Sequence, residues 1–117
     1  MMEHHDVTGF VLANEYPWEE IGTGVKRKIL AYEQEIMLVR FEFKKGSIGA
    51  LHSHPHKQVG YLVSGSFEVT IDGEKRILKA GDAYLTLPNI EHGVVALEDS
   101  VLMDVFTPLR EDFLKKS

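Results

Sequence analysis

Three of the six histidines alternate with other residues in the stretch LHSHPHKQVG, at His52, His54 and His56, and Gln58 follows at the same spacing. Imidazole nitrogens bind divalent transition metals, and they also titrate near neutral pH. The pattern is therefore consistent with a metal site, a pH sensor or a polar loop rich in imidazole. The chain has no cysteine, which excludes disulfides, thiolate metal ligands and a cysteine nucleophile.

The spacing of these residues suits a strand that turns and returns. Alternate side chains of an extended strand point to the same face, so His52 and His54 can approach one point. A turn at Pro55 can bring Gln58 back towards that point on a neighbouring strand. Because Pro55 redirects the backbone, we expect His56 to be a solvated turn residue and not a further ligand.

The elements that must position these residues are short strands. Runs of alternating apolar residues, rich in β-branched and aromatic types and separated by glycine-containing turns, predict an all-β protein. The predicted strands are 7–13, 25–32, 36–43, 58–65, 66–72, 75–80, 83–88, 93–98 and 101–108. Only 110–116, acidic at its start and basic at its end, predicts a helix. This many strands in 117 residues indicates one domain, a sandwich or jelly-roll barrel spanning about 7–108.

A second segment, GDAYLTLPNIEHGV (81–94), places another histidine in a strand–turn–strand pattern. Together the two segments resemble the paired cupin motifs, G-x5-H-x-H-x3,4-E-x6-G and G-x5-P-x-G-x2-H-x3-N. The first motif matches at Gly46, His52, His54 and Gly65, with Gln58 in the glutamate position. The second matches at Gly81 and His92 and departs from the family at Leu87, Asn89 and Ala96. The resemblance spans roughly residues 36–107.

The resemblance implies the cupin double-stranded β-helix, a jelly-roll barrel, with His52, His54, Gln58 and His92 as metal ligands. Three neutral imidazoles and an amide oxygen suit a divalent ion such as Mn, Fe, Ni, Co, Cu or Zn. A barrel that has lost its metal is the alternative, because Gln58 brings no negative charge. If the ion is bound, a neutral fourth ligand leaves it a stronger Lewis acid, which favours proton-transfer chemistry over oxygen activation.

The stretch VLMDVFTPLRED (101–112) carries a further set of reactive side chains. Asp104 and Phe106 alternate with Met103 and Val105, and an aspartate that faces the barrel interior needs a partner or a role. Arg110 follows the strand and can lie at the rim, where its fork would hold a carboxylate. The residues alone are equally compatible with an Asp104 that faces solvent and an Arg110 that only begins the helix.

The segments HSHPHKQ, GDAYLTLPNIEHGV and DVFTPLREDF together resemble the KdgF-like cupins of pectin degradation. That resemblance implies conversion of 4,5-unsaturated uronates to the linear 5-keto-4-deoxyuronate, with Asp104, Phe106 and Arg110 as the catalytic residues. The partner would then be a small acidic sugar. Two alternatives stay open: a non-catalytic cupin that binds a small ligand, and a cupin oxygenase or isomerase acting on another substrate.

The remaining expectations concern the partners, the location and the oligomeric state of the protein. The net charge of -5 and the lack of a basic stripe argue against nucleic-acid binding. Short apolar runs and an N-terminus without a signal-peptide pattern predict a cytoplasmic protein with no membrane span. We expect a homodimer, with the predicted strand 7–13 extending a partner's sheet. We also expect Arg27 on the exterior of its strand, with the pocket rim as the less favoured alternative.

Overall fold

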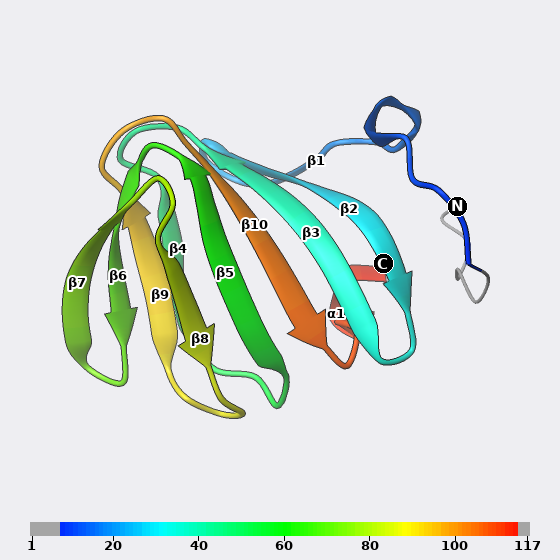
Figure 1. Ribbon diagram of the computed structural model, residues 1–117. Helices are drawn as coiled ribbons and strands as arrows, with labels where there is room; N and C mark the ends of the chain where they lie inside the picture. Colours follow the sequence, from blue (N-terminus) through cyan, green and yellow to red (C-terminus); the bar gives the residue numbers. More distant parts are fainter. Residues whose placement is uncertain (1–7, 115–117) are drawn as a thin grey trace.

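The structure is a computed structural model that describes residues 8–114, and two antiparallel β-sheets form its body (Figure 1). The six-stranded sheet has the order β1-β2-β3-β10-β5-β8 and the four-stranded sheet the order β4-β9-β6-β7. The strands are β1 Glu19–Gly22, β2 Val25–Glu33, β3 Ile36–Phe43, β4 Ile48–His52, β5 Lys57–Ser64, β6 Ser66–Ile71, β7 Glu74–Lys79, β8 Ala83–Thr86, β9 His92–Ala96 and β10 Ser100–Thr107. This architecture confirms the predicted all-β jelly roll.

The core lies between the two sheets and follows from the alternation of the strands. Along β10 the residues from Ser100 to Thr107 alternate between buried and half-buried, so every second side chain enters the interior. Phe43 of β3 and Phe67 of β6 meet edge to face across the sandwich, with ring centroids 5.0 Å apart. Burial of each such side chain contributes about 1.5–3 kcal/mol to folding.

The N-terminal prediction was wrong. Residue 7 lies outside the described range, residues 8–12 have no regular structure, and Ala13–Glu15 forms a 3-10 turn. Phe10 is 98% exposed, because no neighbouring strand pairs with this segment to bury its apolar face. In Figure 1 the segment extends away from the sandwich.

The sequence missed two strands and placed the helix approximately. The missed strands β1 and β4 are short and mostly exposed, so they lack the buried alternation that identifies a strand. The helix α1 spans Glu111–Leu114, and residues 115–116 of the predicted helix lie outside the described range. No helix among the described residues is long and apolar enough to cross a membrane.

Candidate active site

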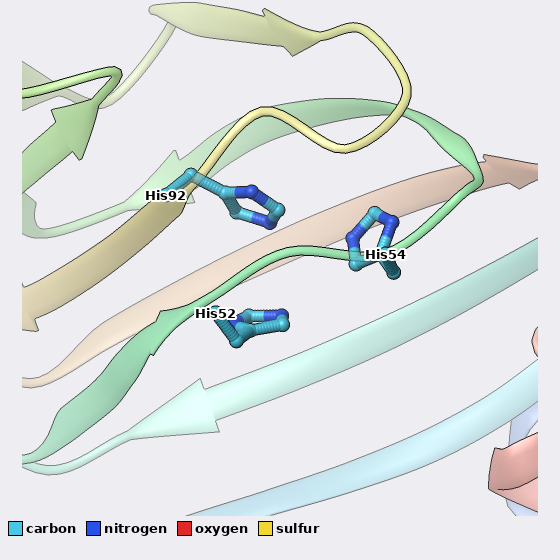
Figure 2. A group of neighbouring side chains, drawn as sticks. All are labelled: His52, His54 and His92. Carbon is cyan, nitrogen blue, oxygen red and sulfur yellow. The ribbon is translucent and has the colours of Figure 1, made fainter.

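Three histidines converge beside the end of β4 and the start of β9 (Figure 2). His52 ends β4 and His92 begins β9, and the two are direct partners in the antiparallel pairing. His54 lies just beyond β4, in the connection to β5. Their ligand nitrogens lie within 4.8 Å of one another. Strand register and one short loop thus bring together three side chains that the sequence separates by up to forty residues.

Backbone carbonyls orient two of these rings. The Nδ1–H of His52 donates to the Ala50 carbonyl oxygen at 2.8 Å, and that of His92 donates to the Ile90 carbonyl oxygen at 2.9 Å. A carbonyl can only accept, so Nδ1 carries the proton in each ring and Nε2 keeps its lone pair. This arrangement is typical of metal-binding histidines, whose second nitrogen is held by an outer partner.

Gln58 joins the cluster from the opposite sheet. Its Oε1 lies 2.8 Å from His54 Nε2 and 3.1 Å from His92 Nε2. Its amide nitrogen donates to the Tyr84 hydroxyl at 3.2 Å, which fixes the oxygen on the histidine side. The structure therefore brings together the three imidazoles and the amide oxygen that the cupin resemblance implied as ligands.

The electrostatic state of the histidines suits a metal ion. Burial lowers the pKa of His54 to about 4, partly offset by its hydrogen bond to Gln58, and burial also lowers the pKa of His92. Both rings are therefore neutral near pH 7, the form that binds metals. The three histidines could hold a divalent transition ion of the kind that prefers nitrogen ligands.

Tyr84 is a site residue that the sequence reasoning did not single out. It lies on the inner face of β8, and its hydroxyl donates to Asp104 Oδ1 at 3.2 Å. The hydroxyl also accepts from Gln58, so hydrogen bonds connect the histidine cluster to Asp104. Tyr84 alternates with the buried Thr86, and that inward spacing in the second motif was the available signal.

Asp104 faces the interior of the protein and is 3% exposed. Burial raises the pKa of Asp104 to about 7, although hydrogen bonds from Gln58 and Tyr84 and the charge of Arg110 favour the carboxylate. Burial and the neighbouring Asp104 also raise the pKa of Tyr84 well above its ordinary value. The sequence did not decide whether Asp104 faces solvent or the interior. In the structure Asp104 lies in the interior, next to the histidine cluster.

One cavity of about 360 Å³ joins these groups, a size that suits a small ligand. Its polar lining includes His52, Gln58, Tyr84, His92, Asp104 and Arg110. Phe106 also lines it and is 1% exposed, with its ring centroid 5.9 Å from that of His54.

Arg110 lies three residues beyond the end of β10, and an acidic neighbour holds it in place. Its Nε and Nη2 donate to the two carboxylate oxygens of Asp112 at 3.0 and 2.8 Å, and this ion pair holds the pKa of Asp112 below its usual value. Its guanidinium lies over the Phe106 and Phe113 rings, at 5.1 and 4.3 Å from the centroids. The structure thus places Arg110 at the cavity with Asp104 and Phe106.

Two expectations need correction. Arg27 does not face the exterior: it pairs with Phe41 across β2 and β3, shares the inward face of that buried residue, and lines the cavity. His56 is half-buried and not a solvated turn residue, because its Nε2 donates to the Leu109 carbonyl oxygen at 3.1 Å. It is not a member of the three-histidine cluster.

Comparison with known proteins supports one family. The cupin domain model matches residues 39–106. The pectin degradation protein KdgF of Dickeya dadantii (strain 3937) is 53% identical over 107 residues, which cover 90% of this chain and 97% of that protein. A structure of KdgF from Halomonas sp. matches with a TM-score of 0.87 and 41% identity, covering 92% of this chain and 99% of that one. An RmlC-like cupin from Shewanella frigidimarina matches with a TM-score of 0.88 and 40% identity, covering 92% and 96%. Because the cupin model matches more than half of the chain and these relatives cover nearly all of it, the chain belongs to the cupin superfamily and, within it, to the KdgF-like family.

Proposed function

We propose that this chain is a metal-dependent cupin enzyme that converts 4,5-unsaturated uronates, released from pectin or alginate, to the linear 5-keto-4-deoxyuronate. The 53% identity to a pectin degradation protein, over 97% of that protein, supports the substrate class. The observation that carries the reaction is one cavity whose lining includes two residues of the histidine cluster, His52 and His92, together with Asp104, Phe106 and Arg110. An acidic monosaccharide matches both the volume of this cavity and its arginines.

The residues that would hold the metal are His52, His54, Gln58 and His92. When bound, a divalent transition ion supplies Lewis-acid polarisation of a substrate oxygen. Gln58 contributes an oxygen but no negative charge, which suits this role better than the stabilisation of a higher oxidation state. Imidazole nitrogens and an amide oxygen are ligands for which Mn, Fe, Ni, Co, Cu and Zn are all suitable ions.

The protein residues would bind the sugar and move protons. In the substrate, a C4=C5 double bond adjoins the ring oxygen, and the anomeric carbon carries a hydroxyl. Ring opening breaks the bond between C1 and the ring oxygen and leaves an aldehyde and an enol. Delivery of a proton to C4, with loss of the enol proton, then gives the 5-keto product. Asp104 would transfer this proton, a contribution typically of about 10²–10⁴-fold.

Arg110 and Phe106 would position the sugar. The Arg110 guanidinium carries the positive charge that a uronate carboxylate requires, and Asp112 holds it in place. Phe106 supplies an apolar ring against the face of the sugar.

The proposal is tested with 4,5-unsaturated galacturonate. We expect purified protein with added divalent metal to remove the enol-ether absorbance, and a chelator to abolish this activity. Asp104→Asn should lower kcat by about 10²-fold or more while keeping its metal. Arg40→Gln is the matched surface control, because Arg40 pairs with Glu42 outside the cavity. Full turnover by a metal-loaded Asp104→Ala variant would contradict the role of Asp104, and no turnover by the wild type would contradict the function.

A further inference from the structure

Arg27 places a positive charge on a face of β2 that is otherwise apolar. Its neighbours on that face, Val25 along the strand and Phe41 across it, are buried. The Arg27 side chain is 15% exposed and lines the cavity. An inward-facing charge lowers stability unless other groups compensate it, so its position requires partners.

Two contacts hold the Arg27 guanidinium in place and leave much of it available. Its Nε donates to Glu19 Oε1 at 3.1 Å, across the pairing of β1 with β2. Its guanidinium carbon lies 4.0 Å from the centroid of the Phe113 ring. Within residues 8–114, no group is hydrogen-bonded to its two terminal nitrogens. The guanidinium is therefore oriented by its Nε edge and one face, and within the described part of the chain its terminal amino groups keep their donor capacity.

Arg110 also lies over Phe113, but more of its hydrogen-bond donors are already used than those of Arg27. Its Nε and one terminal nitrogen already bind both carboxylate oxygens of Asp112. Of the two arginines that line the cavity, Arg27 keeps the larger hydrogen-bonding capacity.

The charge of the cavity lining favours an anionic ligand. Among the described residues that line it, Asp104 is the only acidic one, against Arg27 and Arg110. A carboxylate that enters would be the natural partner of a guanidinium whose two terminal nitrogens have no hydrogen-bond partner among the described residues.

We propose that Arg27 is a second substrate-binding residue, whose terminal amino groups receive the carboxylate of the sugar acid while Arg110 adds positive charge from its ion pair with Asp112. This inference rests on the proposed function, which supplies a substrate with a carboxylate. It assigns substrate binding to the β1–β2 edge of the large sheet as well as to the segment after β10.

Kinetics and direct binding test this assignment. Arg27→Gln should raise KM for 4,5-unsaturated galacturonate about 10- to 100-fold, with kcat changed by less than about threefold, because a charge-assisted bond in the bound state is lost. Calorimetry with sodium galacturonate should show a similar loss of affinity. Arg27→Lys should recover part of it as a point charge. Unchanged KM and unchanged galacturonate affinity in Arg27→Gln would overturn the inference.

Glu19→Gln separates substrate binding from a structural role. It removes the charge that holds Arg27 but keeps the arginine, so we expect KM within about threefold of the wild type. An equal rise of KM in Glu19→Gln and Arg27→Gln would mean that the ion pair, and not a substrate contact, explains the effect. Arg40→Gln controls for the change in net charge, and thermal unfolding checks that each variant folds.

The two proposals fail in different ways. Absence of turnover by the metal-loaded wild type contradicts the proposed function, whatever Arg27 does. The galacturonate titration then still decides the inference: wild-type protein that binds galacturonate no better than Arg27→Gln contradicts it, and a loss of affinity in the variant supports it.

Discussion

Gln58 presents an acceptor oxygen to the histidines and a donor to Tyr84, which an ionised glutamate in the same place could not do. Its oxygen lies beside two imidazole nitrogens, and its amide nitrogen donates to Tyr84, which in turn donates to Asp104. An ionised glutamate has only acceptors and would leave the Tyr84 hydroxyl without this donor. The exchange of glutamate for glutamine therefore does more than remove a charge: it connects the candidate metal site to the candidate proton-transfer residue.

The buried Asp104 carboxyl makes the stability of the metal-free protein depend on pH. Its pKa of about 7 in the folded protein lies above the ordinary value of 3.8, so the folded state binds a proton that the unfolded state has released between these values. The contribution of Asp104 to stability is thus lost as the pH rises from about 4 to about 7. With chelator present, we expect the free energy of unfolding of the wild type, relative to Asp104→Asn, to fall by roughly 2–3 kcal/mol from pH 5 to pH 8.

Urea denaturation of both proteins at each pH measures this difference. Comparison with Asp104→Asn cancels the opposing effect of the histidines, whose lowered pKa values make stability rise over the acid range. Parallel curves for the two proteins across this range would contradict the prediction.

The sequence located the site residues that lie close together in the chain or carry a recognised motif. Alternation placed Asp104 and Phe106 on one face, and the turn at Pro55 returned Gln58 towards His54. Arg27 and Tyr84 depend instead on which strands become neighbours: Arg27 faces inward with Phe41 of β3, and Tyr84 reaches Asp104 across β5. The two-residue period of a strand defines its two faces. Where both faces carry apolar and charged residues, the period does not show which face points into the core.

At the scale of elements, Gly60 makes room for the hydrogen bond between Tyr84 and Asp104. This bond joins β8 to β10 across the intervening strand β5. Gly60 of β5 is the register partner of both Tyr84 on β8 and Asp104 on β10. A Cβ atom at Gly60 would clash with the Tyr84 ring, so the ring occupies the space that a side chain would take. The missing side chain lets Tyr84 cross over β5 and reach Asp104.

Gly60→Ala should therefore displace Tyr84 from Asp104. We expect a loss of about 1–3 kcal/mol in the free energy of unfolding, the usual range for overpacking a core, together with lower kcat. Chemical denaturation and the uronate assay measure these effects. Gly9→Ala is the control, because a Cβ at Gly9 has no neighbour within 4 Å. Equal stability and activity of the two variants would contradict the role assigned to Gly60.

The strands themselves show where sequence patterns suffice. The full alternation of β3 and β10 identified them, since both lie inside the large sheet and bury one face. The run 7–13 has a similar apolar content, but a strand requires a hydrogen-bonded neighbour, and residues 8–12 have none. Short edge segments such as β1 carry too little burial to leave a pattern.

At the scale of the whole molecule, the outer face of the large sheet predicts self-association. Val59, Tyr61 and Leu85 are apolar side chains there with 44%, 48% and 57% exposure, and Val59 pairs with Leu85. Such a patch can pack on its own copy about a twofold axis, which replaces the strand extension predicted from residues 7–13. We expect a homodimer in a sizing experiment, weakened by Tyr61→Lys but not by Ile77→Lys on β7. A wild-type monomer at working concentration would contradict this prediction.

The candidate metal ligands come from both sheets, so metal binding should stabilise the entire sandwich. His52 and His92 belong to β4 and β9 of the small sheet, and Gln58 to β5 of the large one. Unfolding separates these strands, and an ion that binds only the folded arrangement adds about 2–3 kcal/mol at a hundredfold excess over its Kd. In a domain of this size that corresponds to a rise in Tm of roughly 10 °C. His52→Ala is a suitable variant, because His52 is exposed and its loss leaves the core intact. Thermal scans of chelated protein with and without added metal should show the rise in the wild type and a much smaller one in His52→Ala, whereas an equal rise in both would place the bound metal elsewhere.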